Sequence, residues 1–116
     1  MGRTRTRTAP GLVLDTGALI ALERGDKRMI ALLHRALAQG RTFRVPVGVV
    51  GQAWRNGRFQ VTLARFLRSE EVEIVPLDDQ LARSCGELGG AASASDVIDA
   101  SVVIVARERQ DLIVRG

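Results

Sequence analysis

Four short apolar runs, separated by segments with helical patterning, constrain the fold of this chain more than any other feature. Each run is bounded by turn-forming or charged residues, as is typical of a buried strand. The runs lie at residues 12–14, 43–46, 72–75 and 112–114. Segments with apolar residues at helical spacing lie between them, at 18–24, 29–38, 47–54, 60–67, 78–88 and 96–107. Because alternating strands and helices pack best as a covered parallel sheet, we predict a three-layer α/β/α fold with four or five central parallel strands.

The length of 116 residues suits a single domain, and a hydrophobic content of 46% is enough for a small core. Aromatic residues make up only 3%, so we expect that core to be aliphatic. Residues 1–10 alternate arginine and threonine with nothing apolar to bury, and we interpret them as a basic flexible tail. The predicted domain then covers residues 11–116. No apolar run has the length of about 20 residues that spans a bilayer, so we expect no membrane association.

The charge of the chain is compatible with two classes of partner. The formal net charge is +4, and Lys27 is the only lysine among the 17 basic residues. This balance suits the phosphates of a nucleic acid, and it suits an acidic protein surface equally well. Cys85 is the only cysteine, so an internal disulfide and a thiolate metal site are both excluded. We expect a cytoplasmic protein, and we interpret Cys85 and the single histidine, His34, as non-catalytic.

Asp15 is the first candidate functional residue, because it follows the apolar run 12–14 directly. Functional groups of parallel sheets lie just beyond the carboxyl ends of the strands. Aspartate at this position is also a good N-cap for the helix that follows. The sequence leaves both roles open.

Asp96 and Asp99 form a second acidic group, three residues apart at the start of an apolar helix. This spacing places their Cβ atoms about 5–6 Å apart on one helix face, where two carboxylates repel each other unless a cation is present. Ser93 and Asp96 also match a capping box, which is a structural alternative for Asp96. Carboxylates from a strand end and a helix are suitable ligands for Mg²⁺ or Mn²⁺, which can orient a phosphate and activate water. We therefore expect Asp15, Asp96 and Asp99 to meet in one cleft.

Three segments in this order resemble the motifs of the PIN-domain ribonucleases, in particular the VapC-like toxins of type II toxin–antitoxin systems. The first is residues 12–22, where a hydrophobic strand ends in Asp15 and is followed by Thr16. The second is residues 45–55, and the third runs from Ser95 through Asp96 and Asp99 to residue 106. The resemblance extends over nearly all of residues 12–114.

The resemblance implies a metal-dependent endoribonuclease, a toxin that hydrolyses RNA, often transfer RNA. It further implies a small DNA-binding antitoxin as a partner, and we expect a homodimer. Asp15, Asp99 and Asp96 would be the catalytic acids and the ligands of Mg²⁺ or Mn²⁺, with the Thr16 hydroxyl near the metal. We also expect a groove near these acids to accept an antitoxin segment that carries an arginine, because a cation would be attracted to an acidic cluster.

The chain departs from the family pattern at two places. The second motif usually supplies a glutamate, and Gln52 stands at that position, also beside the metal, with an oxygen acceptor but no charge. A further acid usually follows the last strand, whereas here Arg115 occupies the approach to it, so we expect a shortened or altered C-terminal segment. Glu87 and Asp111 are the acids that could compensate.

These departures keep other functions open beside the ribonuclease. The main alternative is a catalytically weakened PIN-like protein that binds RNA or an antitoxin, which Gln52 and the short C-terminal segment favour. A third possibility is a response-regulator-like module, which also uses strand-end aspartates. The chain lacks the acidic pair near its N-terminus and the lysine after a late strand that such a module would need.

Overall fold

The computed structural model of the chain describes residues 9–58, 60–89 and 93–116. Most of the predicted tail, residues 1–8, lies outside the described residues. The strands are β1 (Leu12–Leu14), β2 (Phe43–Pro46), β3 (Val72–Val75) and β4 (Leu112–Val114). The helices are α1 (Thr16–Glu23), α2 (Lys27–Ala38), α3 (Val47–Ala53), α4 (Val61–Leu67), α5 (Asp79–Gly89) and α6 (Ala94–Arg109).

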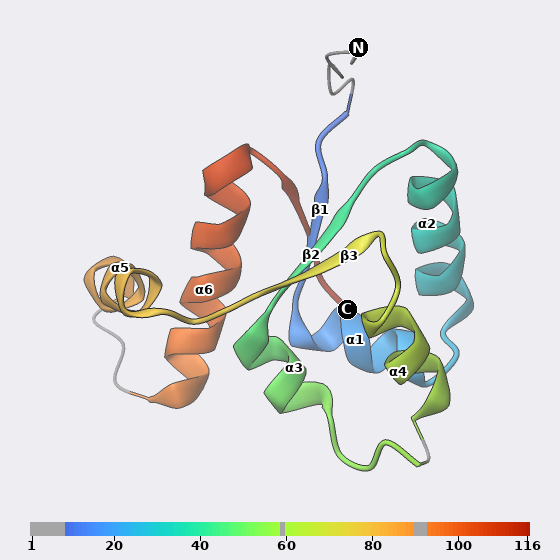
Figure 1. The fold of residues 1–116 in the computed structure, drawn as a ribbon, viewed down its shortest axis with the longest axis horizontal. Coiled ribbons are helices and arrows are strands. Elements are labelled where there is room, and N and C mark those ends of the chain that lie inside the picture. The colour runs from blue at the N-terminus through green and yellow to red at the C-terminus, as the bar shows by residue number, and fades with distance from the viewer. Residues whose placement is uncertain (1–8, 59, 90–92) are drawn as a thin grey trace.

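The described strands form one parallel sheet in the order β3-β2-β1-β4 (Figure 1). In register, Leu12 of β1 pairs with Phe43 of β2 on one side and with Leu112 of β4 on the other. All three residues of β1 are buried, which explains why the run is continuously apolar rather than alternating. The prediction of a parallel sheet with four or five strands is confirmed.

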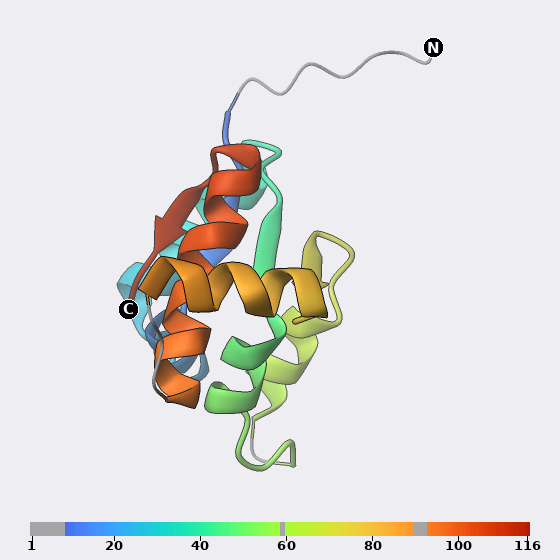
Figure 2. The same cartoon turned by 90° about the vertical axis from the view of Figure 1, so that its left-hand side faces the viewer.

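Helices cover both faces of this sheet, which confirms the predicted three layers. Helix α6 packs against β1, β2 and β4, and α5 lies against α6 (Figure 2). Helices α1, α2 and α4 occupy the opposite side, with α1 in contact with the other two (Figure 1). Helix α3 continues directly from the end of β2 and contacts both α1 and α6. The carboxyl edge of the sheet therefore lies where α1, α3 and α6 meet.

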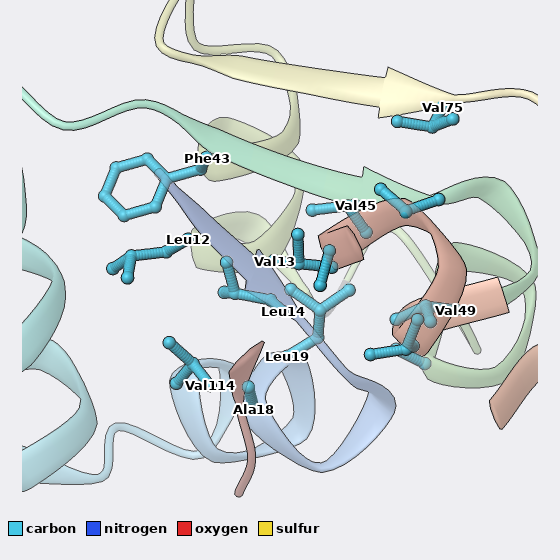
Figure 3. Packing of buried hydrophobic residues seen from close by; sticks show 14 of the residues in the cluster. Leu12, Val13, Leu14, Ala18, Leu19, Phe43, Val45, Val49, Val75 and Val114 are labelled. Carbon is cyan, nitrogen blue, oxygen red and sulfur yellow. The ribbon is translucent and has the colours of Figure 1, made fainter. Parts of the chain in front are cut away.

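The core between the layers is aliphatic, as predicted. Its largest fully buried side chains are Leu14, Leu19, Leu63, Val13, Val45, Val49, Val102 and Val105, together with Pro46 and Cys85. Figure 3 shows Val13, Leu14, Leu19, Val45 and Val49 packed together. The aromatic contribution is the tilted pair Phe43–Phe66, whose ring centroids are 5.6 Å apart. Cys85 is a packing residue in this core, and burial raises the pKa of its thiol, which keeps the thiol protonated and unreactive.

Two local features depend on contacts between distant segments. Gly48 lies inside α3 although glycine disfavours helices, because a Cβ atom there would lie 2.7 Å from Cγ1 of Ile98. Arg44, in the middle of β2, is only 5% exposed. It donates a hydrogen bond to the carbonyl of Val105 at 3.3 Å and forms ion pairs with Glu73 and Glu108, both at 3.4 Å. The arginine thus connects β2 to β3 and to α6.

We expect Leu19→Ala to lower the free energy of unfolding by about 2–5 kcal/mol, because it leaves a cavity in the closed interior. Leu19 has no exposed surface, whereas Leu32 on α2 is 41% exposed. The matched variant Leu32→Ala should therefore change stability by only about 0.5 kcal/mol. Urea unfolding of both variants measures the difference, and equal losses would contradict the described packing.

Candidate functional site

Asp15 lies at the carboxyl end of β1 and fixes three neighbouring segments. Its backbone N–H donates to the carbonyl of Val114 at 3.1 Å. Its Oδ1 accepts hydrogen bonds from the N–H of Ala18 at 2.8 Å and from the N–H of Gly116 at 3.3 Å. Asp15 is therefore the N-cap of α1, the structural role that the sequence left open, and it also positions the segment that follows β4.

The second carboxylate oxygen of Asp15 faces a cation supplied by the same chain. Oδ2 lies 3.5 Å from an Nη atom of Arg115, with 18% of the Asp15 side chain and 57% of the Arg115 side chain exposed. An ion pair with one partner this exposed contributes about 0–1 kcal/mol. The pair is weak enough for Arg115 to be displaced, and it partly neutralises the carboxylate while it lasts.

A chain of polar side chains joins this strand end to the two helices beside it. The Thr16 hydroxyl, in the first turn of α1, donates to Oε1 of Gln52 on α3. Gln52 in turn donates through Nε2 to the hydroxyl oxygen of Ser95 on α6, at 3.2 Å. Thr16 and Gln52 are thus in direct contact, and Ser95, which sequence reasoning did not select as a site residue, completes the connection.

Asp96 and Asp99 are both exposed on the first turns of α6. The backbone N–H of Asp96 donates to the Ser93 hydroxyl at 3.1 Å, so Ser93 is the N-cap of the helix, which is one of the two hydrogen bonds of a capping box. Asp99 follows Ser95 by four residues and therefore lies one turn further along the helix face that reaches Gln52. Asp96 is rotated further around the helix. Asp99 is accordingly the acid of this pair that is better placed to act together with the polar chain.

The described residues do not assemble a ready-made metal site. Among them, no group of three or more aspartate, glutamate, histidine or cysteine side chains is arranged to hold a metal ion. The oxygen atoms present are chemically suitable for Mg²⁺. However, Gln52 is neutral and its Oε1 is engaged by Thr16, while Asp15 faces Arg115. These oxygen atoms are engaged with other groups in this arrangement, and the meeting of Asp15, Asp96 and Asp99 around a divalent cation stays a prediction.

The other acids considered from the sequence differ in where they lie. Asp111 precedes β4, and its Oδ1 accepts a hydrogen bond from the N–H of Gly11, which precedes β1, at 3.0 Å. It therefore lies at the amino edge of the parallel sheet, opposite to Asp15, and cannot compensate at this site. Glu87 is exposed on α5, and His34 is exposed on α2.

No protein family and no curated protein matches the sequence. Solved structures do match the fold. VapC20 of Mycobacterium tuberculosis, described as a sarcin–ricin loop cleaving toxin, superposes with a TM-score of 0.64 at 19% identity, over 87% of this chain and 85% of VapC20. VapBC2 of Rickettsia felis, solved with a DNA fragment from its promoter, gives a TM-score of 0.60 at 14% identity, over 90% of this chain and 97% of the other. The chain has the fold of VapC-like PIN domains, as the sequence motifs predicted.

No single helix in the described parts of the chain is both long and apolar enough to cross a membrane. The bent pair α5 and α6 passes the same test on length and composition alone.

The two roles of Asp15, helix cap and functional acid, can be separated by substitution. Asp15→Asn keeps an oxygen acceptor for the N–H groups of Ala18 and Gly116 and removes only the charge, so stability should stay within about 0.5 kcal/mol of the parent. Asp15→Ala removes the acceptor and should cost about 0.5–2 kcal/mol. Chemical unfolding checks both values, and an Asn variant as unstable as the Ala variant would show that the charge itself holds this edge together.

Proposed function

We propose that the chain is a PIN-type ribonuclease, the toxin of a toxin–antitoxin pair, which hydrolyses phosphodiester bonds of RNA. The observation that carries the proposal is the polar chain Thr16–Gln52–Ser95. It connects the turn after Asp15 with the helix that carries Asp96 and Asp99, and this supports the proposal that these acids act together at the carboxyl edge of the sheet. The fold supports the proposal, because VapC20 is described as cleaving the sarcin–ricin loop.

The proposal includes Mg²⁺ or Mn²⁺ as cofactor, with Asp15, Asp99 and Asp96 as its ligands. Since Gln52 brings no charge and Arg115 already faces Asp15, we expect weak binding and slow cleavage that requires millimolar metal. When bound, such a cation would supply a Lewis acid beside the scissile phosphate. The residues of the chain would hold the carboxylates at one edge of the sheet and bind the RNA.

Gln52 and Arg115 also favour a second function, that of a binding protein. In a binding protein without catalysis, Gln52 would serve only to connect α1, α3 and α6, and Arg115 would remain on Asp15. The RNA or the antitoxin would then be held without being cleaved. The ion pair Arg115–Asp15 is the observation that favours this candidate.

The proposed protein partner is a small DNA-binding antitoxin, and the similarity to VapBC2, which is described as bound to a DNA fragment from its promoter, supports this. The contact of Arg115 with Asp15 gives this proposal a chemical basis, because the site already accepts a guanidinium group. An arginine of the antitoxin would compete with Arg115 for the same carboxylate. We also propose that the toxin forms a homodimer.

Gln52→Glu should raise the rate of RNA cleavage, because a glutamate can accept hydrogen bonds from both Thr16 and Ser95 while adding a charge for the metal. Asp99→Asn should abolish cleavage. Asp79→Asn on α5, which changes an exposed acid that pairs with Arg83, is the matched control and should cleave like the parent. Initial rates with an RNA substrate, in millimolar Mn²⁺ and in chelator, measure these effects. If the first two variants also cleave like the parent under both conditions, the binding protein becomes the better proposal.

Arg115→Ala should lower the Mn²⁺ concentration for half-maximal cleavage by up to about fivefold, because a competing cation worth up to ~1 kcal/mol leaves Asp15. The control is Arg107→Ala, which removes another exposed arginine in the last turn of α6. A metal titration of each variant gives the comparison. A requirement unchanged by Arg115→Ala and by Arg107→Ala alike would show that Arg115 does not compete with metal.

A further inference from the structure

The loop after α3 presents the only tryptophan of the chain beside two exposed arginines. We call residues 54–58 the tryptophan loop; it contains Trp54, Arg55 and Arg58. Trp54 is 39% exposed, so part of a large aromatic surface faces solvent. Trp54 follows Gln52 by two residues and so lies within about 7 Å of it along the backbone. Figure 1 shows this loop leaving α3 at the same edge as α1 and the start of α6.

A buried glutamine holds the tryptophan loop in shape. Gln60 is 7% exposed, and its Oε1 accepts hydrogen bonds from the N–H of Arg55 at 2.8 Å and from the N–H of Asn56 at 2.9 Å. Its Nε2 donates to the carbonyl of Ala53 at 3.0 Å. A buried amide is costly without partners, and this one takes all three from the loop and the helix end before it. The hydrogen bonds of Gln60 therefore hold the loop backbone against the end of α3.

The indole of Trp54 packs against the backbone of its own loop. A Cβ atom at Gly57 would lie 2.5 Å from Cζ2 of Trp54, so the ring packs directly on the glycine backbone. Arg55 donates from its guanidinium to the backbone carbonyl of Trp54 at 3.0 Å. Asn56 accepts the N–H of Arg58 at 3.0 Å and closes the turn. An aromatic surface and two exposed arginines thus lie within five consecutive residues.

We propose that the tryptophan loop binds an unpaired nucleotide of the RNA, with the base stacked on Trp54 and the neighbouring phosphates at Arg55 and Arg58. Aromatic rings flanked by arginines bind single strands in this way, because every base has a flat face and every nucleotide a charge. A duplex hides its base faces, and an acidic peptide would pair with the arginines but leave the indole unused. The proposal rests on the proposed function and specifies its substrate: RNA with an exposed base beside the cleavage edge.

Since the chain has one tryptophan and no tyrosine, its emission reports on residue 54 alone. The probe is a single-stranded oligoribonucleotide of mixed sequence, about 12 residues long, titrated in chelator into the Asp99→Asn variant to prevent cleavage. We expect strong quenching of Trp54 emission and an affinity at least about tenfold higher than for the same sequence as a duplex. Unchanged emission at saturation, or equal affinity for the duplex, would overturn the proposal.

Substitutions in the tryptophan loop test the contacts one by one, with a labelled oligoribonucleotide as reporter. Trp54→Ala should weaken binding about tenfold, and Trp54→Phe should restore most of it, which also guards against a folding defect. Arg58→Gln should weaken binding and lower the salt dependence by about one phosphate contact. Arg83→Gln, an exposed arginine on α5, is the matched control and should bind like the parent. Wild-type affinity of Trp54→Ala would refute a stacking role.

Experiments can distinguish a failure of the proposed nucleotide site from a failure of the proposed ribonuclease function. If the parent protein does not cleave RNA but Trp54 is quenched by single strands, the ribonuclease is wrong and the nucleotide site stands. If Trp54→Ala cleaves and binds RNA like the parent, the nucleotide site is wrong and the ribonuclease stands. Quenching by a co-expressed antitoxin, with none by RNA, would assign the tryptophan loop to the protein partner and overturn the proposal.

Discussion

Asp15 uses one carboxylate oxygen to hold the N–H groups of two segments about a hundred residues apart, Ala18 at the start of α1 and Gly116 after β4. Its own N–H is fixed on Val114. The segments meet so closely that a Cβ atom at Gly116 would lie 2.0 Å from the carbonyl oxygen of Gly17. The geometry of the carboxyl edge therefore depends on the hydrogen bonds of Asp15, the same residue that we propose as a catalytic acid. This dual demand explains why one oxygen is committed to backbone donors and only the other faces outward.

Local patterns were sufficient to predict the fold, because its short strands are apolar runs with sharp ends. The predicted bounds of all four strands agree with the structure. The sequence could not predict features set by distant partners. Arg44 appears as a polar residue in a strand, and only the approach of Glu73 and Glu108 makes its burial tolerable. Likewise, Gly48 remains helical because Ile98 packs against it. The burial of Arg44 and the helical conformation of Gly48 both depend on contacts between layers. Local sequence patterns do not contain this information.

Individual residues of the candidate site were predictable from the sequence, but their connection was not. The strand-end rule selected Asp15, and motif resemblance selected Gln52, but the link through Ser95 requires the rotation of α6 relative to α3. The same rotation decides how far the acids of α6 lie from the strand end, which is why their spacing along the helix alone could not settle it. The tryptophan loop left a trace in the sequence, a lone Trp54 shortly before Asn-Gly. Its order, however, comes from Gln60, whose side chain folds back on the loop.

The pairing of β1 with β4 also determines when this edge can exist during protein synthesis. Leu12 pairs with Leu112, and Gly11 bonds to Asp111 across a separation of 100 residues. Contacts of such long range form late, because the intervening chain must be ordered before they are gained. A nascent chain on the ribosome can therefore complete β2 and β3 beside β1 while Asp15 still lacks Val114 and Gly116. A partner that recognises the finished edge therefore meets only chains in which β4 has already joined the sheet.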